Sequence, residues 1–122
     1  MVVLCLDTYP LVEIAKGNQK FGHLLEQDFI ITEITMAEFY YVILQGYNAA
    51  TADFWYRKLQ HYCVQVPKET LIKGVNFRFE NRTKNFSFFD SVGYVFSVEH
   101  HHTFVTGDKE FEAMKGVMYL IG

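Results

Sequence analysis

Four acidic residues occupy positions from which their carboxylates could form a single catalytic or metal-binding site. Asp7 follows the apolar run 2–6, and Asp108 follows a second apolar run at 103–106. Both acids therefore come just after the carboxyl ends of predicted strands, where open α/β sheets bind their ligands. Glu38 and Asp90 each lie near the start of a predicted helix. If these elements share one parallel sheet, the four carboxylates can converge on a single edge of it.

Helix capping offers a purely structural interpretation of the same acids. Thr35 precedes Glu38 by three positions and Ser87 precedes Asp90 by three, which is the spacing of a capping box. The two strand-end acids are also acceptable N-cap residues. Capping explains each acid taken singly. Four carboxylates at one sheet edge, however, would repel one another unless a cation lay between them.

A cluster of this composition suits a hard divalent cation. Mg²⁺ and Mn²⁺ prefer oxygen ligands and are commonly held by carboxylates together with phosphate oxygens of a substrate, whereas zinc favours Cys and His. The implied chemistry is phosphodiester hydrolysis. One or two metal ions would orient and deprotonate a water for in-line attack, and would stabilise charge on the phosphate and on the leaving 3′ oxygen.

The elements that must position these acids alternate along the chain. Apolar runs predict strands at residues 2–6, 29–32, 63–66, 103–106 and 117–121. Helical periodicity and capping signals predict helices over residues 8–16, 20–27, 35–47, 51–60, 69–82, from 87 to the loop at 100–102, and 108–114. Pro67 terminates the third strand, because proline has no backbone N–H to give to a sheet.

The alternation indicates an α/β fold. Strands separated by helices need crossover connections, which favour a mainly parallel sheet covered on both faces. We therefore expect a three-layer α/β/α arrangement with about five strands. The chain has 122 residues with only eight Gly and two Pro, and no stretch resembles a linker. A single domain spanning residues 1–122 is expected.

Composition excludes several classes of function. The formal net charge of −3 rules out nucleic-acid binding by bulk basic charge, so phosphate contacts must be local. Cys5 and Cys63 lack Cys-x-x-Cys spacing, which argues against a zinc site or a redox pair and favours free thiols in a reducing cytosol. The run 2–6 is too short for a signal peptide, and no run reaches membrane-spanning length. We expect a cytoplasmic protein without membrane contact.

Four short segments, in fixed order within the chain, carry a resemblance to a known family. They are Leu6-Asp7-Thr8, Ile34 to Tyr40, Phe86 to Ser91 and Phe104 to Phe111. Together they resemble the PIN domain, and within it the small VapC-type ribonucleases that act as toxins of toxin–antitoxin pairs. Each segment is a weak signal alone, but the four in this order are fairly specific and cover nearly the whole chain.

The resemblance implies a metal-dependent endoribonuclease that uses Mg²⁺ or Mn²⁺ to cleave RNA. Its acidic site would consist of Asp7, Glu38, Asp90 and Asp108. By position, the three aspartates would hold the metal directly or through water, and Glu38 would complete the site from the opposite wall. Such proteins are often homodimers inhibited by a small antitoxin protein.

Supporting residues can be carried over by position as well. Thr106 and Glu110 are candidates for contacts that orient the metal ligands. The chain departs from the family at Tyr9-Pro10, where relatives often carry a small polar residue after Asp-Thr, so a supporting hydrogen bond from that position is not expected. Proline is still compatible with the first turn of a helix.

A local excess of basic residues offers a substrate-binding hypothesis. Residues 68–84 carry a net charge of +3 and the rest of the chain −6, because five cations outnumber two acids: Lys68, Lys73, Arg78, Arg82 and Lys84 against Glu69 and Glu80. A solvated helix with i, i+4 neighbours would explain this arrangement. The functional interpretation is that Arg78 and Arg82 contact RNA phosphates beside the acidic site.

Two other groups of residues have simpler explanations. His100, His101 and His102 precede the strand 103–106, so about 10–15 Å of strand separates them from Asp108, and a solvated loop is expected. Aromatic residues are dense in the two middle helices, where most should pack in the core. The remainder could form a groove for an antitoxin helix or a homodimer surface. That set is Phe39, Tyr40, Tyr41, Tyr47, Phe54, Trp55 and Tyr56.

Two other functions compete with the ribonuclease. A catalytically silent module could keep the fold and the acidic pocket and act by binding a protein. A nuclease for DNA or structured RNA could use the same metal chemistry, because no residue in the sequence is identified as a contact to the 2′ hydroxyl.

Overall fold

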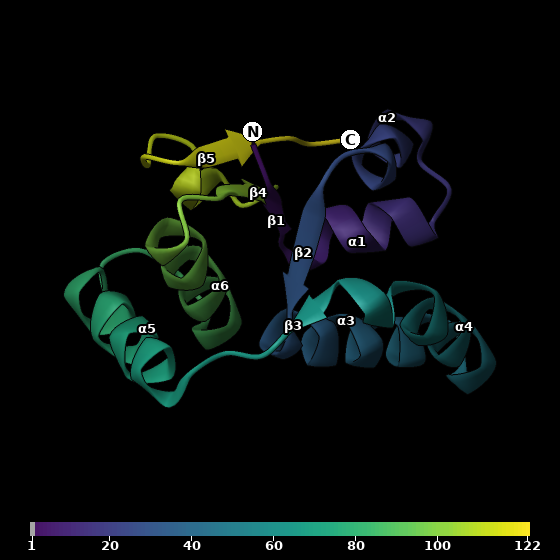
Figure 1. Ribbon diagram of the computed structural model, residues 1–122, viewed down its shortest axis with the longest axis horizontal. Helices are drawn as coiled ribbons and strands as arrows, with labels where there is room; N and C mark the ends of the chain where they lie inside the picture. Colours follow the sequence, from purple (N-terminus) through teal and green to yellow (C-terminus); the bar gives the residue numbers. More distant parts are fainter. Residues whose placement is uncertain (1) are drawn as a thin grey trace.

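Five parallel strands form the central sheet in the computed structural model, which describes residues 2–122 (Figure 1). Their spatial order is β3-β2-β1-β4-β5, so the chain starts at the middle of the sheet, builds one half, and then crosses back to build the other. The strands are β1 (Leu4–Leu6), β2 (Phe29–Thr32), β3 (Cys63–Val64), β4 (Thr103–Thr106) and β5 (Val117–Tyr119).

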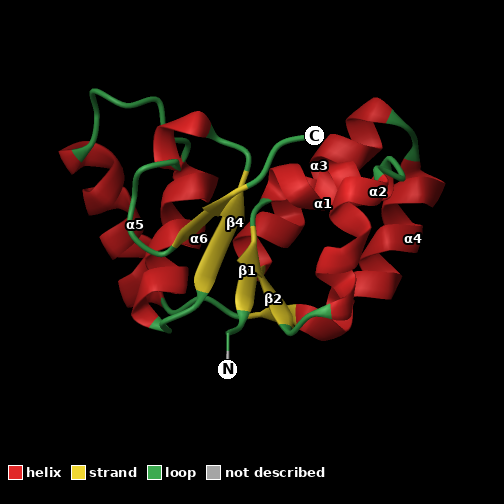
Figure 2. Ribbon diagram, turned by 90° about the horizontal axis from the view of Figure 1, so that it is seen from above, coloured by secondary structure: helices red, strands yellow, loops and turns green. Residues whose placement is uncertain are grey.

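Helices cover both faces of this sheet. Figure 2 shows α5 and α6 on one side of the strands and α1 to α4 on the other, which confirms the predicted three-layer α/β/α fold. The helices are α1 (Thr8–Ala15), α2 (Gln19–Gly22), α3 (Glu33–Gly46), α4 (Ala49–Leu59), α5 (Lys68–Glu80) and α6 (Phe88–Glu99). Three short 3₁₀ helices join them: η1 (His23–Glu26), η2 (Gln60–Tyr62) and η3 (Lys109–Phe111).

The central strand β1 is buried on both faces, because successive side chains of a strand point in opposite directions. Leu4 and Leu6 pack into a core shared with α1 to α4. Cys5 points into the other core, which includes Val92 of α6 and Phe104 of β4. This two-sided burial explains why the run has no polar residue before Asp7.

The strand register brings the carboxyl ends of β1 and β4 together. Leu6 is paired with Val105, and the Asp7 N–H donates a 3.0 Å hydrogen bond to the Val105 carbonyl oxygen. The residues that follow the two strands therefore start from the same edge of the sheet. Helix α1 begins at Thr8 and η3 at Lys109, so both chain segments turn immediately after this edge.

The capping pattern predicted for α3 is wrong. Thr32, the last residue of β2, is the N-cap, and its hydroxyl accepts a 3.1 Å hydrogen bond from the Thr35 N–H. The helix thus begins two residues before Thr35, and Glu38 lies in its second turn, free of any capping role. The capping box of α6 is confirmed, since Ser87 Oγ accepts from the Asp90 N–H at 3.0 Å and Asp90 Oδ2 accepts from the Ser87 N–H at 3.4 Å.

Other boundaries differ where tertiary contacts replace the local pattern. Strand β3 ends at Val64, three residues before Pro67, because its partner strand β2 ends at Thr32, the residue paired with Val64. Beyond the strand, the Val66 N–H donates to Glu33 Oε2 at 2.5 Å. The predicted helix 20–27 is split into α2 and η1, and the predicted helix 108–114 is only the single turn η3. Helix α5 ends at Glu80, where the Asn81 side-chain amide donates to the Phe77 carbonyl oxygen at 2.9 Å.

Within residues 2–122, no helix has the length and apolar character needed to cross a membrane.

Candidate metal centre

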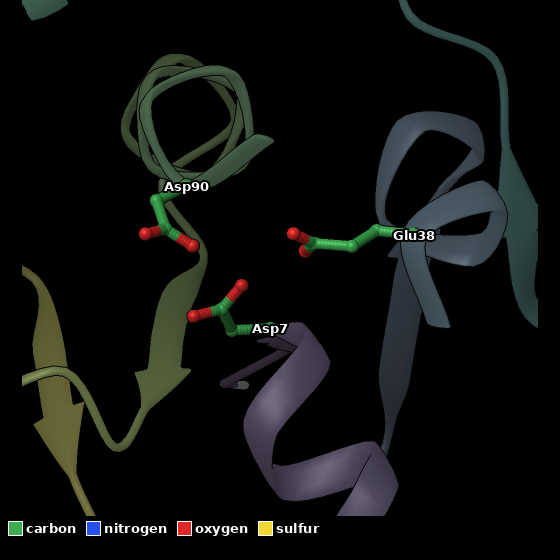
Figure 3. Close-up of side chains that lie close together, drawn as sticks. All are labelled: Asp7, Glu38 and Asp90. Carbon is green, nitrogen blue, oxygen red and sulfur yellow. The ribbon is translucent and has the colours of Figure 1, made fainter. Parts of the chain in front are cut away.

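Three carboxylates from three separate elements converge at the carboxyl edge of the sheet (Figure 3). One oxygen each from Asp7, Glu38 and Asp90 lies within 4.8 Å of the other two. Asp7 comes from the junction of β1 and α1, Asp90 from the first turn of α6, and Glu38 reaches in from α3. The structure therefore brings together three of the four acids that the sequence predicts to converge.

Asp7 is the most buried of the three, with only 3% of its surface exposed. Its Oδ2 accepts a 2.8 Å hydrogen bond from the Thr106 hydroxyl. Its Oδ1 is buried and has no hydrogen-bond partner among the described residues. A buried carboxylate oxygen without a donor is costly, so this atom marks a position where a cation or a proton is needed.

Glu38 is held in place by Thr8, whose hydroxyl donates a hydrogen bond to Glu38 Oε1. The bond links the first turn of α1 to the second turn of α3, and it directs the carboxylate toward the other two acids. No local pattern predicts this contact, because Glu38 lies 30 residues away from Thr8. The position of Thr8 directly after Asp7, in the segment Leu6-Asp7-Thr8, is the only signal for it in the sequence.

Asp108 lines the same pocket but lies outside the group of three close carboxylates within residues 2–122. Its Oδ1 accepts a 2.9 Å hydrogen bond from the Glu110 N–H, so it acts as the N-cap of η3. Its backbone N–H donates to the Thr106 hydroxyl oxygen at 3.1 Å. Asp108 therefore contributes negative charge at the rim, while Glu110 itself is exposed and does not line the pocket.

The acids open into a pocket of about 390 Å³. Tyr9 forms part of its wall, and its hydroxyl accepts a 3.1 Å hydrogen bond from the Gly122 N–H instead of contacting an acid. The Tyr9 ring packs so closely on Gly107 that a Cβ there would lie 2.2 Å from a ring carbon. Tyr9 thus shapes the wall of the pocket, and its close packing favours glycine at position 107.

Electrostatics at this site favour binding of a positive charge. Burial, followed by repulsion from Asp90, raises the pKa of Asp7 to about 8, although the hydrogen bond from the Thr106 hydroxyl opposes the shift. Burial also raises the pKa of Glu38 and of Asp90, and Asp108 adds to the shift at Asp90. Ionised carboxylates at this spacing destabilise one another, and a divalent cation would relieve the repulsion.

The residues present fit a hard divalent cation. The three converging side chains supply carboxylate oxygens only. Asp7 Oδ1 has no hydrogen-bond partner among the described residues. No histidine or cysteine among the described residues belongs to the group, which disfavours zinc. This donor set is the kind that holds Mg²⁺ or Mn²⁺ together with waters and substrate oxygens.

The remaining candidates lie elsewhere. Arg78 and Arg82 line a separate pocket beside α5. The His100 ring stacks on Phe96 with 4.1 Å between centroids, and the histidine loop precedes β4, at the opposite end from the acids. Burial raises the pKa of the Cys5 and Cys63 thiols, as expected for unreactive free cysteines.

Solved structures with this fold include toxin–antitoxin proteins of low sequence identity. The chain superposes on a toxin–antitoxin complex from Klebsiella pneumoniae with a TM-score of 0.76 and 18% identity, covering 97% of this chain and 99% of the other. VapC20 of Mycobacterium tuberculosis, described as a sarcin-ricin loop cleaving toxin, gives a TM-score of 0.78 at 13% identity, covering 93% and 96%. The chain has the PIN-domain fold of VapC proteins.

The same PIN-domain fold occurs in the DNA-bound VapBC complex from Salmonella typhimurium, with a TM-score of 0.77, 16% identity and 98% of both chains covered. No sequence-family model matches the chain, and no curated protein does. At identities of 13–18%, these structures share the PIN-domain fold with this chain.

Proposed function

We propose that this PIN-fold protein is a metal-dependent endoribonuclease and the toxin of a toxin–antitoxin pair. The observation that carries the proposal is the convergence of Asp7, Glu38 and Asp90, with a buried, unpartnered oxygen on Asp7. The fold shared with a sarcin-ricin loop cleaving toxin supports RNA as the substrate.

Each acid has a distinct place in the proposed site. Asp7 and Asp90 would hold the cation from the sheet edge, and Glu38, oriented by Thr8, would close the site from α3. Asp108 would act at the rim, through water or by its charge. Thr106 fixes Asp7 by its hydrogen bond and is a positioning residue.

A bound Mg²⁺ or Mn²⁺ supplies a lowered water pKa and neutralises charge at the scissile phosphate. In the proposed hydrolysis, water adds to phosphorus and the bond to the 3′ oxygen breaks, which leaves a 3′ hydroxyl and a 5′ phosphate. Because the pKa of Asp7 is raised to about 8, this carboxyl group holds a proton at neutral pH when no cation is bound, so cation binding would displace that proton.

The proposed partner is a small antitoxin protein. Structures of toxin–antitoxin complexes with this fold support it. Large aromatic side chains on α3, on α4 and at the turn between them would give it a surface, because Tyr41, Tyr47, Phe54 and Tyr56 are all exposed. The prediction that most of the seven aromatic residues in this segment pack in the core is wrong, because four of them are exposed and only Phe39 is fully buried. We also propose that two copies of the chain associate, as the family resemblance implies.

Cleavage of a mixed-sequence single-stranded RNA and its DNA counterpart tests the proposal. Purified protein is assayed with Mn²⁺, Mg²⁺ or EDTA, beside Asp7→Asn and Asp90→Asn. We expect metal-dependent RNA cleavage that falls by roughly 100-fold or more in both variants. Asp28→Asn, an exposed aspartate outside the pocket, is the matched control and should cleave normally.

The alternatives predict different results. Metal-dependent cleavage of DNA but not RNA would replace the ribonuclease with a DNA nuclease. No cleavage and no metal binding would favour a silent interaction module. Equal activity in wild type, Asp7→Asn and Asp90→Asn would show a contaminating nuclease and would remove the support for this site.

A further inference from the structure

A second pocket, the α5 pocket, lies beside the C-terminal half of α5 and the loop that follows it. It measures about 370 Å³, and its walls include Arg78, Phe79, Arg82, Lys84, Asn85 and Phe86. The volume lies within the range of small-ligand sites. In contrast to the acidic centre, its charged side chains are all cations.

These cations have no acidic partner in the described part of the chain. The two ion pairs found in residues 2–122 are Lys16 with Glu13 and Lys73 with Glu99. Arg78, Arg82 and Lys84 belong to neither pair. The i, i+4 interpretation fails for Lys84 because α5 ends at Glu80, so Lys84 lies beyond the helix. Three unpaired cations around one pocket attract phosphate.

Both arginines are held at the pocket by backbone contacts. Arg78 Nε donates to the Phe86 carbonyl oxygen at 2.9 Å, and Arg82 Nη1 donates to the Phe79 carbonyl oxygen at 3.0 Å. The other guanidinium N–H groups make no hydrogen bond within residues 2–122, so they remain available to a ligand. Anchored arginines lose less entropy on binding than free ones.

Phe79 brings an aromatic ring to the same place. Its side chain is 63% exposed, and the Arg82 guanidinium lies 4.4 Å from the ring centroid. Arg82 covers one face of the ring, and a side chain that stays this exposed has room for a base on the other face. Aromatic rings beside unpaired cations form the platforms on which single-stranded nucleic acids stack their bases.

The α5 pocket and the acidic centre are joined by a short stretch of chain. The α5 pocket is lined by Lys84, Asn85 and Phe86, and the next residue, Ser87, lines the pocket of the acidic centre. Phe86 is fixed in the core by stacking on Phe77 and Phe111, with centroids 5.5 and 4.1 Å away. At most about 11 Å of chain separates Lys84 from Ser87. An RNA strand bound at the acidic centre can therefore reach the α5 pocket.

We propose that the α5 pocket binds an unpaired nucleotide of the RNA, with its base stacked on Phe79 and its phosphate held by Arg78, Arg82 and Lys84. The inference rests on the proposed function for the identity of the strand. It adds to that function a second contact, made outside the acidic centre, that positions the RNA. The three cations of this pocket also offset the electrostatic repulsion between RNA and the rest of the chain, which carries a net charge of −6.

Fluorescence anisotropy with a labelled single-stranded RNA of mixed sequence tests the pocket without cleavage. All proteins carry Asp90→Asn and are measured in EDTA, so the RNA stays intact whether or not the chain is a nuclease. We expect Phe79→Ala to weaken binding about 5-fold or more, the effect of losing one base stack. Phe79→Tyr, which keeps the ring, should bind like the parent, whereas Phe79→Leu should bind like Phe79→Ala.

Matched controls separate stacking from general surface effects. Ile72 is also 63% exposed on α5 but lies outside the pocket, so Ile72→Ala should not change RNA affinity. Arg82→Gln should lower the slope of log K against log salt by about 0.7, the value of one single-strand phosphate contact. Arg57→Gln, an exposed arginine on α4, should leave the slope unchanged. On an abasic strand of equal length, Phe79→Ala should have no effect.

Two results would overturn the proposal. One is RNA affinity that is equal in Phe79→Ala and Ile72→Ala. The other is a change in oligomeric state in Phe79→Ala, seen by sedimentation velocity, with RNA affinity per folded chain unchanged, since that would make this face a contact between copies. The cleavage assay fails or succeeds independently of these binding measurements, so failure of the nuclease and failure of the pocket are distinguishable.

Discussion

The Thr106 hydroxyl donates a 2.8 Å hydrogen bond to Asp7 Oδ2, across a sequence separation of 99 residues. The same hydroxyl oxygen accepts a 3.1 Å hydrogen bond from the Asp108 N–H. One side chain at the end of β4 thus fixes the carboxylate that follows β1 and the turn that leads into η3. It also satisfies one Asp7 oxygen, while the other, Oδ1, has no hydrogen-bond partner among the described residues.

Replacing Thr106 with valine should destabilise the fold and the site together. Thr106→Val keeps the shape but leaves Asp7 Oδ2 and the Asp108 N–H without their partner. We expect the free energy of unfolding, measured with urea in EDTA, to fall by about 1–3 kcal/mol. Thr106→Ser restores the hydroxyl and should recover most of the loss. Equal stability of the serine and valine variants would contradict the role assigned to this bond.

The metal-free protein should lose stability as pH rises from about 4 to about 8. The pKa of Asp7 is about 8 in the folded chain and 3.8 as its ordinary value. Between these values the folded state holds a proton that the unfolded state has lost, so stability falls as pH rises, by up to about 1.4 kcal/mol per pH unit. The raised pKa values of Glu38 and Asp90 act in the same direction.

Urea unfolding in EDTA across this pH range checks the slope. Asp7→Asn removes the titrating group and should flatten the curve, so the variant should be more stable than wild type near pH 8. Asp28→Asn should follow the wild-type curve. If the free energy of unfolding of the wild type rose from pH 5 to pH 8, the pKa values of these carboxyl groups would not be raised by folding.

The parts of the fold that depend on local patterns were predictable from the sequence. Strand β4 was predicted at residues 103–106 and is found there. The capping box at Ser87 and Asp90 was predicted because all of its partners lie within three residues. Convergence of the acids followed from one further assumption, that the strands are parallel, since parallel strands end at a common edge.

The parts that depend on tertiary contacts were not predictable. The Thr8 contact to Glu38 spans 30 residues, and no local pattern encodes it. Strand β3 is shorter than predicted because its partner strand β2 ends at Thr32, opposite Val64, and no local pattern at 63–66 shows where that partner stops. The basic stretch was visible in the sequence, but only the early end of α5 shows that Lys84 has no helical partner.

Mn²⁺ should stabilise the folded chain through the acidic centre. A ligand that binds only the folded state adds about 2.7 kcal/mol when present at 100 times its Kd. Asp90→Asn removes one of the three close carboxylates and should reduce the rise in Tm, whereas Asp28→Asn should not. The rise should also grow from pH 5 to pH 8, because protons compete with the cation for the same oxygens.

Differential scanning fluorimetry with millimolar Mn²⁺ and with EDTA measures this shift. An equal shift in wild type and Asp90→Asn would place the cation elsewhere on the molecule. The absence of any shift in wild type would mean that the three acids bind no Mn²⁺ at that concentration.

The close packing of α5 on α6 should make Gly74→Ala destabilising. A Cβ at this position would lie 2.7 Å from Val92 Cγ2 and 3.1 Å from Val92 Cα. Alanine gains about 1 kcal/mol in helix propensity over glycine, but overpacking against a buried backbone costs about 1–3 kcal/mol. We expect a net loss of up to about 2 kcal/mol in the free energy of unfolding.

Gly46→Ala is the matched control, because a Cβ at Gly46 in α3 meets nothing within 4 Å. It should be neutral or stabilise by about 0.4–1 kcal/mol. If Gly74→Ala stabilised the chain equally, α5 would not be pressed against α6 at this point. Helix α5 carries Arg78 of the α5 pocket but none of the three close carboxylates, which lie on other elements. A displaced α5 should therefore weaken RNA binding in the anisotropy assay while leaving the Mn²⁺ shift intact.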